Sequence, residues 1–270
     1  MTNSLPDALS ASVARIHRSF AAGKVFIPFF TCGDPDLETT ANCVRAAIQA
    51  GAGPVEFGMP FSDPMAEGPV IQAASARAIA GGATTDKIFA MIAQLREEFP
   101  DTPFITMGYA NSVFSYGIEK WSQAAAAAGV DGAILADVPH EESTEFAPTF
   151  AAHGISLIPL IAPTSKERIA QIAASATGFI YVVSSLGVTG VRSEITTDIG
   201  SIVRVIRDTT QVPSAVGFGV STPEQASQMS ARSDGVIVGS AIVRLIHESG
   251  PEKAPQAVGE YVTKMVAALQ

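Results

Sequence analysis

The chain of 270 residues is acidic and rich in apolar residues, with a formal net charge of −9, 47% hydrophobic residues and 16% charged residues. This apolar content is enough for a sizeable core, and so few charges argue against an intrinsically disordered chain. The 17 lysines and arginines form no cluster along the sequence, which excludes a typical nucleic-acid-binding face.

Cysteine usage and the N-terminus both indicate a protein that is neither exported nor membrane-bound. Cys32 and Cys43 are too few for a disulfide framework, and we interpret them as small buried side chains in a reducing compartment. The first 20 residues lack the apolar core of a signal peptide, and no run approaches the roughly 18 apolar residues that span a bilayer. We therefore expect a soluble cytoplasmic protein.

Short apolar runs alternate with longer alanine-rich segments along the chain. An amphipathic helix is expected first, at about Asp7–Ala22. The predicted strands are Val25–Phe30, Pro54–Phe57, Phe104–Met107, Gly132–Ala136, Ile155–Ile161, Phe179–Val183, Val212–Val216 and Gly235–Val238. The predicted later helices are Asp36–Gly51, segments between Val70 and Phe99, Glu119–Gly129, Glu141–His153, Ser165–Ala176, Ile199–Thr209, Thr222–Ala231, a short helix from Ser240, and Pro251–Gln270.

The alternation of strands and helices predicts an α/β fold built from βαβ units. Strands that are apolar throughout are typical of a parallel sheet covered on both faces. Eight such units in this length favour a closed (β/α)8 TIM barrel with an extra N-terminal helix over an open, doubly wound sheet. No linker divides the chain, so we expect one domain over residues 1–270. Such barrels carry their chemistry at the C-terminal ends of the strands, so the catalytic residues are expected at those positions.

Glu56 is a lone carboxyl inside an apolar strand, between Val55 and Phe57. A carboxylate in a β-core is costly unless it is paired or neutral. One interpretation is a structural glutamate that is hydrogen-bonded to a loop. The other is a general acid whose pKa is raised by burial. The loop that follows carries Asp63 and Glu67 among prolines and glycines, which favour a fixed loop shape.

The stretch Ser184–Thr197 follows the sixth predicted strand and is long and polar. It is either an ordinary surface loop or a lid with glycine hinges. Glycines also follow the seventh and eighth strands, at Gly219 and Gly239, and Ser240 begins a helix. Glycine lets the backbone approach an anion and a helix N-terminus favours negative charge, so this pair of turns predicts a phosphate site.

The remaining polar residues give weaker signals. The four histidines have no metal-ligand spacing, and no metal site is expected. Asp137 ends the fourth predicted strand and either orients a loop or contacts a ligand. None of the six lysines lies at the C-terminal end of a predicted strand, which argues against a Schiff-base aldolase, another barrel lyase.

Taken together, these motifs resemble the tryptophan synthase alpha chain over nearly the whole sequence. The segments that carry the resemblance are FIPFFTCGDP, VEFGMPFSDP, GYANSVF, ILADVPHEES, SSLGVTG, VGFGVSTPEQ and VGSAIV, in this order. The resemblance implies a retro-aldol cleavage of indole-3-glycerol phosphate to indole and glyceraldehyde 3-phosphate, without a cofactor. It also implies a partner, the pyridoxal-phosphate-dependent beta chain, in an α2β2 assembly that is contacted by the loop around Pro60 and Asp63 and by the region near Asn111.

The same resemblance assigns roles to single positions. Glu56 matches the acid that protonates indole C3, and Tyr181 matches a tyrosine near it. Glu67 matches the carboxylate at the indole N–H, where the most familiar members carry aspartate. The positions that match the remaining contacts are Gly190, Gly219, Gly239 and Ser240 for the substrate phosphate, Phe29, Met107 and Ile134 for the indole ring, and Thr189 for the lid. A second departure lies at Ser185–Leu186, where members often carry arginine.

Two other functions stay open at this point. The chain could release indole as a free-standing lyase without a beta chain. It could also bind and activate a beta chain without turning over substrate, although both carboxylates of the family are kept, which argues against this function.

Overall fold

The computed structural model describes residues 7–183, 199–217 and 219–270. The strands in these ranges are β1 Val25–Thr31, β2 Val55–Gly58, β3 Phe104–Gly108, β4 Gly132–Leu135, β5 Ser156–Leu157, β6 Leu160–Ile161, β7 Ile180–Val183, β8 Ser214–Gly217 and β9 Gly235–Val238. The helices are α1 Asp7–Ala21, α2 Leu37–Gln49, α3 Pro69–Ala80, α4 Thr85–Glu98, α5 Ala110–Tyr116, α6 Ile118–Ala127, the 3-10 helix η1 His140–Glu145, α7 Ala147–Ala152, α8 Lys166–Ala174, α9 Ile199–Thr209, α10 Pro223–Ser230, α11 Ser240–Ser249 and α12 Ala254–Ala267.

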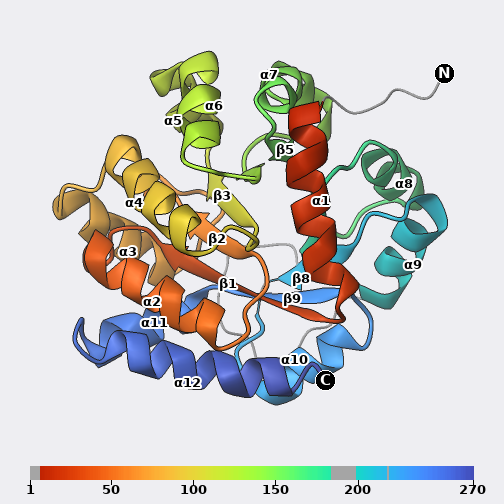
Figure 1. The fold of residues 1–270 in the computed structure, drawn as a ribbon. Coiled ribbons are helices and arrows are strands. Elements are labelled where there is room, and N and C mark those ends of the chain that lie inside the picture. Colours follow the sequence, from red (N-terminus) through yellow and green to blue (C-terminus); the bar gives the residue numbers. More distant parts are fainter. Residues whose placement is uncertain (1–6, 184–198, 218) are drawn as a thin grey trace.

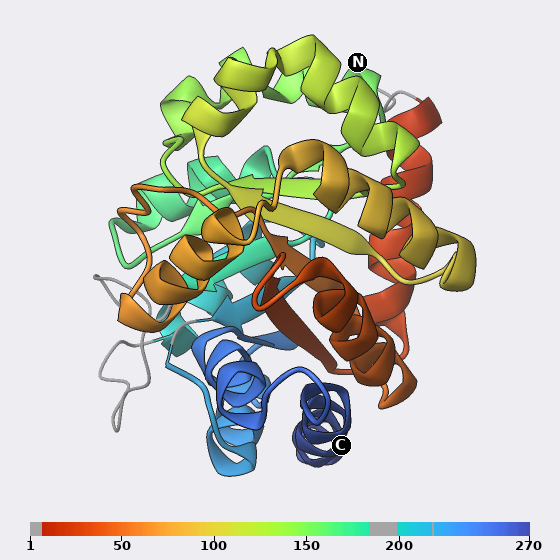
Figure 2. The ribbon, with the colours of Figure 1, turned by 90° about the vertical axis from the view of Figure 1, so that its left-hand side faces the viewer.

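The strands pair in parallel in the order β5-β4-β3-β2-β1-β9-β8-β7-β6. The two ends of this order, β5 and β6, are consecutive in the chain and are separated only by residues 158–159. β5 pairs with β4 and β6 pairs with β7, so this one segment joins the two sides of the sheet. The helices surround the strands (Figures 1 and 2), and the predicted TIM barrel is confirmed.

Side-chain alternation along the strands divides the core into two layers. One cluster of apolar residues fills the inside of the barrel and includes Ile27, Ile105 and Ile237. The other lies between the outside of the barrel and the helices and includes Phe30, Phe57 and neighbouring residues of α2. This pattern follows from parallel strands that are covered on both faces, where both sets of side chains are removed from water.

Helix α1 lies against the N-terminal ends of several strands. Arg15 forms an ion pair with Asp131, which directly precedes β4. His17 Nε2 lies 2.9 Å from the carbonyl oxygen of Gly178, two residues before β7. At the other end of the chain, α12 packs beside α2 (Figure 2). Because α1 covers the N-terminal side of the barrel, the C-terminal ends of the strands are left for the long loops.

The structure differs from the predicted elements in three places. The single strand predicted at Ile155–Ile161 is divided into β5 and β6 at Pro159, which has no N–H to donate to a ladder. Helix α5 forms directly after β3, where no helix was predicted. The helix predicted at Glu141–His153 begins as the 3-10 helix η1 and becomes α-helical only at α7, where Pro148 occupies the first turn.

Candidate active site

Glu56 points into the barrel. Its neighbours Val55 and Phe57 belong to the outer layer, and the side chain itself is 1% exposed. Neither carboxyl oxygen has a hydrogen-bond partner among the described residues. Burial raises the pKa of Glu56 to about 8. A carboxyl in this setting is protonated at neutral pH, because the charged form would lose its hydration without gaining a partner. It can therefore donate a proton to a bound molecule.

Tyr181 stands on β7 and also faces the barrel interior, with 5% of its surface exposed. Burial and the charge of Glu56 both raise the pKa of the Tyr181 phenol, so the two side chains lie within electrostatic reach. The end of β8 makes room for the ring, because a Cβ at Gly217 would lie 2.2 Å from the Tyr181 hydroxyl oxygen. At physiological pH the Tyr181 phenol and the Glu56 carboxyl are therefore both neutral.

Glu67 lies in the loop between β2 and α3 and is buried, with 7% exposed. Its backbone carbonyl accepts a hydrogen bond of 2.8 Å from Gln72 Nε2 in α3. Burial raises the pKa of Glu67 to about 7, while a hydrogen bond from the Tyr109 hydroxyl opposes that shift. This carboxyl is therefore divided between its two protonation states near neutral pH.

Tyr109 directly follows β3, is 2% exposed, and was not singled out by the sequence analysis. Its hydroxyl accepts the backbone N–H of Ala66 at 3.1 Å and hydrogen-bonds the carboxylate of Glu67. Its ring stacks on Phe61, with 5.0 Å between ring centroids and 25° between planes. Three residues of the Glu67 loop are thus fixed to one tyrosine. The signal in the sequence that could have identified Tyr109 is an aromatic residue close behind the end of the third strand.

Asp137 orients the loop after β3. Its Oδ1 accepts the backbone N–H of Ala110 at 2.8 Å, at the start of α5, and its side chain is exposed. Asp137 also adds to the raised pKa of Tyr109. Of the two roles that the sequence left open, orientation of a loop is the one for which the structure gives contacts.

The three residues assigned to the indole ring all face the barrel interior, where they belong to one apolar cluster. Phe29 on β1 is paired directly with Glu56 on β2, and Met107 on β3 is paired with Ile134 on β4. A Cβ at Gly58 would lie 2.3 Å from the Cζ atom of Phe29, so this glycine leaves the space that the ring occupies. An apolar wall therefore lies directly beside the protonated Glu56.

The glycines predicted to bind phosphate, Gly219 and Gly239, follow β8 and β9 in the structure, and phosphate binding there stays a prediction. Gly219 has φ of +85°, a conformation that favours glycine. Gly239 is the N-cap of α11, and Ser240 is the first residue of that helix. A Cβ at Gly239 would lie 3.4 Å from Phe29 Cδ1, which places this helix start next to the apolar wall. Thr189, Gly190 and the segment Ser184–Thr197 lie outside the described residues.

Neither a metal-binding group nor a membrane-spanning helix is found within the described ranges. No group of three or more His, Cys, Asp or Glu side chains there could hold a metal ion. No helix in this part of the chain is long and apolar enough to cross a membrane. Cys32 and Cys43 are buried free thiols in the outer layer, and burial raises the pKa of both, which makes them unreactive packing residues.

Known proteins that resemble this chain agree with one another. The family model described as tryptophan synthase alpha chain matches residues 18–270. A tryptophan synthase alpha chain from Lacticaseibacillus casei is 45% identical over 250 residues, which is 93% of each chain. The crystal structure of tryptophan synthase subunit alpha from Legionella pneumophila str. Paris superposes with a TM-score of 0.86 at 36% identity and covers 98% of both chains.

A structure of Mycobacterium tuberculosis tryptophan synthase superposes with a TM-score of 0.84 at 28% identity and covers 97% of both chains. The family model extends over nearly the whole chain, and the L. casei alpha chain is 45% identical over 93% of its length. This chain belongs to the tryptophan synthase alpha chain family.

Proposed function

We propose that this protein cleaves indole-3-glycerol phosphate to indole and glyceraldehyde 3-phosphate, as the alpha subunit of tryptophan synthase. The observation that carries the proposal is the buried carboxyl of Glu56, unpartnered among the described residues, beside an apolar wall at the C-terminal side of the barrel. We extend the proposal to a single domain over residues 1–270, located in the cytoplasm.

In the proposed reaction, Glu56 acts first as a general acid. Its raised pKa keeps a proton available at neutral pH, and this proton passes to C3 of the indole ring. The ring becomes an indoleninium ion, in which C3 is tetrahedral. The carboxylate of Glu67 accepts a hydrogen bond from the ring N–H and stabilises the positive charge that develops there.

The bond between C3 and the glycerol side chain then breaks. Its electron pair returns to the ring and restores indole, while the hydroxyl on the adjacent carbon loses its proton and becomes the aldehyde carbonyl. Glu56, now a carboxylate, is the base that takes this proton, so the cycle ends with the carboxyl protonated again. Tyr181 lies within electrostatic reach of Glu56 and, as a neutral phenol, does not stabilise its charged form as a cation would.

The substrate is held at two ends in this proposal. Phe29, Met107 and Ile134 contact the flat ring, since an apolar slot suits a bicyclic aromatic group. The phosphate binds at Gly219, Gly239 and Ser240, where the N-terminus of α11 favours negative charge. Gly190 and Thr189 belong to the same proposal as a further phosphate contact and a lid residue. No cofactor and no metal takes part in these steps.

Glu67 in place of aspartate keeps the carboxyl chemistry and lengthens the side chain by one methylene. Glutamate and aspartate have nearly the same intrinsic pKa, about 4.3 and 3.9. The hydrogen bonds from the Ala66 N–H to the Tyr109 hydroxyl and from Gln72 Nε2 to the Glu67 carbonyl hold the backbone on either side of the Glu67 side chain in place. We therefore propose that the loop backbone is placed for the longer side chain.

We also propose that a beta chain binds at the loop around Pro60 and Asp63 and near Asn111, and that it receives the indole. The M. tuberculosis relatives are structures of tryptophan synthase. Met65 in this loop is 80% exposed and Phe114 in α5 is 47% exposed, both large apolar side chains on the proposed contact surface.

One experiment tests the function directly. Indole formation from indole-3-glycerol phosphate is measured with the purified chain, with and without a tryptophan synthase beta chain. We expect slow release by the chain alone and faster turnover with saturating beta chain, because partner binding orders catalytic loops. Absence of indole in both assays would refute the lyase function, and equal rates in both would favour a free-standing lyase.

A further inference from the structure

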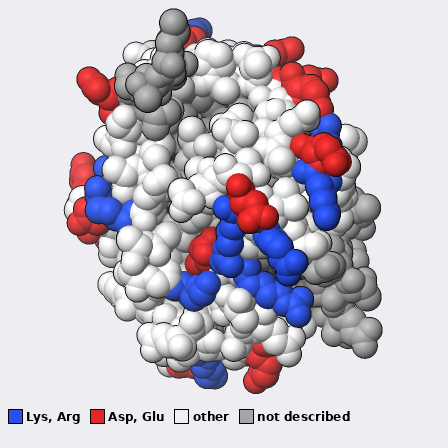
Figure 3. Space-filling model, turned by 90° about the vertical axis from the view of Figure 1, so that its right-hand side faces the viewer, with Lys and Arg blue, Asp and Glu red and all other residues white. Residues whose placement is uncertain are grey.

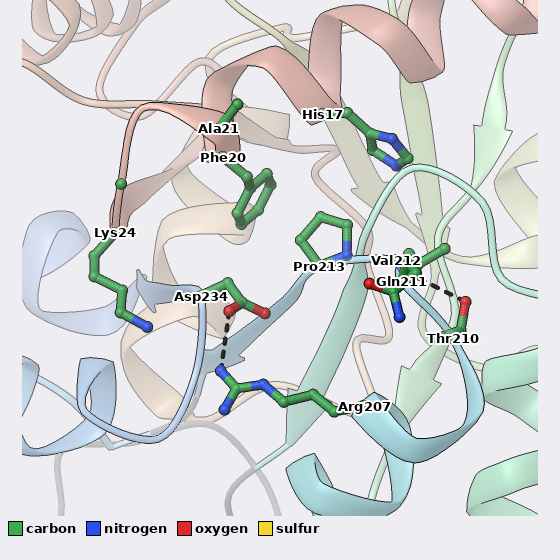
Figure 4. Close-up of a pocket in the computed structure, with 11 residues that line it drawn as sticks. His17, Phe20, Ala21, Lys24, Arg207, Thr210, Gln211, Val212, Pro213 and Asp234 are labelled. Atoms are coloured by element: carbon green, nitrogen blue, oxygen red, sulfur yellow. Dashed lines mark hydrogen bonds and ion pairs between the residues drawn. The ribbon is translucent and has the colours of Figure 1, made fainter.

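A cavity of about 670 Å³ opens at the end of the barrel opposite the candidate active site. Lys24, Pro213 and Asp234 line it, and each lies at the N-terminal side of a strand, directly before β1, β8 and β9. The end of α1 and the end of α9 complete the wall (Figure 4). Its volume falls in the range of about 300–1,000 Å³ that is typical of small-molecule sites.

Two fixed cations stand at one side of this cavity. Arg207 Nη2 donates to Asp234 Oδ1 at 3.0 Å, and Lys24 Nζ donates to the carbonyl oxygen of Ser233. A guanidinium has five hydrogens to donate and an ammonium has three, so both groups keep donors for a ligand. In Figure 4 the Lys24 ammonium lies to the left of Asp234 and the Arg207 guanidinium lies below it, which places both at the same corner of the cavity.

Asp234 is already used by the protein. Its Oδ2 accepts the backbone N–H of Ser214 at 2.9 Å and the Ser214 hydroxyl at 3.2 Å, while its Oδ1 accepts from Arg207. The carboxylate thus holds the guanidinium in place and is not left to bind a cation. Lys24, Arg207 and Asp234 together leave one positive charge at this corner, which matches a monoanion better than a dianion.

An apolar slot lies next to the two cations. Phe20 and Pro213 both line the cavity and lie next to each other in Figure 4, and Val212 lines it as well. The Phe20 ring is fixed by Phe179, with 5.9 Å between the ring centroids. Flat apolar side chains that line a cavity suit a planar ring. Figure 3 shows that lysine and arginine side chains also gather around the middle of this side of the molecule, although the chain as a whole is acidic.

We propose that this cavity binds a small aromatic monocarboxylate. The ring lies against Phe20 and Pro213, and the carboxylate accepts hydrogen bonds from Lys24 and Arg207. The apolar slot supplies the affinity for the ring, and the net positive charge at the corner selects the anion. The site shares no residue with the candidate active site and does not depend on the proposed lyase reaction.

The test uses benzoate as the probe and isothermal titration calorimetry on the full-length protein. We expect benzoate to bind about fivefold or more tightly than benzamide, which has the same ring without the charge, and than acetate, which has the charge without the ring. Arg207→Gln and Lys24→Gln each lower the benzoate affinity about fivefold. Arg204→Gln is the matched control, since Arg204 is exposed on the same helix and does not line the cavity.

A crystal soak locates the bound benzoate against Phe20 and Pro213 if the proposal is correct. Saturating glycerol 3-phosphate leaves benzoate binding unchanged, because that anion is directed to the opposite end of the barrel. Equal binding of benzamide, an equal loss with Arg204→Gln, competition by glycerol 3-phosphate, or no binding at tens of millimolar benzoate would each overturn the inference. Because binding is measured without turnover, these outcomes are independent of whether the chain cleaves indole-3-glycerol phosphate.

Discussion

Replacing Tyr109 by phenylalanine is expected to change how the activity depends on pH, because one hydroxyl fixes the Glu67 loop. That hydroxyl accepts the Ala66 N–H at 3.1 Å and donates its only hydrogen to the Glu67 carboxylate. Phenylalanine keeps the ring and its stacking on Phe61. The variant therefore removes two hydrogen bonds and leaves the packing of the loop almost unchanged.

The size of the effect follows from the two carboxyl groups. The proposed reaction needs Glu67 ionised and Glu56 protonated, so activity should be highest between their pKa values of about 7 and about 8. The Tyr109 hydrogen bond favours the charged form of Glu67, and its loss raises that pKa. A hydrogen bond to a charged group contributes about 1.5–3 kcal/mol, and one pKa unit corresponds to about 1.4 kcal/mol, so we expect a shift of at least about one unit.

At pH 7 such a shift lowers the ionised fraction of Glu67 from about one half to about one tenth, and kcat should fall about fivefold from this cause alone. Looser placement of the carboxylate adds to the loss. The assay is indole release as a function of pH, with kcat and KM determined separately. We expect the acidic limb of the profile to move to higher pH and the basic limb, which reports Glu56, to stay in place.

Tyr116→Phe is the matched control, since the Tyr116 hydroxyl bonds the exposed side chain of Asp86 at 2.5 Å, away from the Glu67 loop. It should leave both limbs unchanged. An unshifted acidic limb in Tyr109→Phe, or a fall in kcat that is uniform across pH, would show that Tyr109 does not act through the ionisation of Glu67.

Three further substitutions test other parts of the site. Glu56→Gln should lower kcat by about 10²–10⁴-fold. In the wild type the free energy of unfolding should fall as pH rises from about 4.5 to about 8, because in this range the Glu56 carboxyl keeps its proton only in the folded state. Urea unfolding at several pH values should show that Glu56→Gln lacks this fall. Gly219→Val should weaken inhibition by glycerol 3-phosphate about tenfold, because a β-branched residue is strained at φ of +85°. The control is Gly250→Val, at φ of +72° with open space around it, which has a similar backbone cost and should leave this inhibition unchanged. Gly58→Ala should displace the Phe29 ring, raise KM and destabilise the fold by about 1–3 kcal/mol in thermal unfolding. An unchanged KM in this variant would show that Phe29 does not contact the indole ring.

Most of the barrel could be predicted from the sequence because each strand buries both of its faces. The runs at Val25–Phe30 and Gly235–Val238 are apolar at every position, and the structure makes them strands β1 and β9, which pair with each other. The break at Pro159 and the helix α5 were not predicted. Short apolar or mixed segments of this kind take their conformation from the neighbours that they pack against, and those neighbours are remote in the sequence.

The residues of the candidate site were predicted to different depths. Glu56 was identified because a carboxyl between Val55 and Phe57 contradicts its surroundings, but alternation alone left two faces possible, and only the packing of its neighbours places it inside the barrel. Tyr109 was missed because tyrosine at a strand end is unremarkable in sequence. Its role depends on Ala66 and Glu67, more than 40 residues earlier in the chain.

The sequence by itself determined the alternation of strands and helices, the glycines at the ends of β8 and β9, and the presence of two carboxyl groups in the right segments, because these depend on local composition and period. Only the tertiary structure decided how strongly each carboxyl is removed from water and which of them receives a hydrogen bond from a tyrosine. Glu56 and Glu67 have nearly the same intrinsic acidity, yet one is enclosed among barrel strands and the other is held by Tyr109. Desolvation depends on every atom within several ångströms, and no stretch of sequence contains that information.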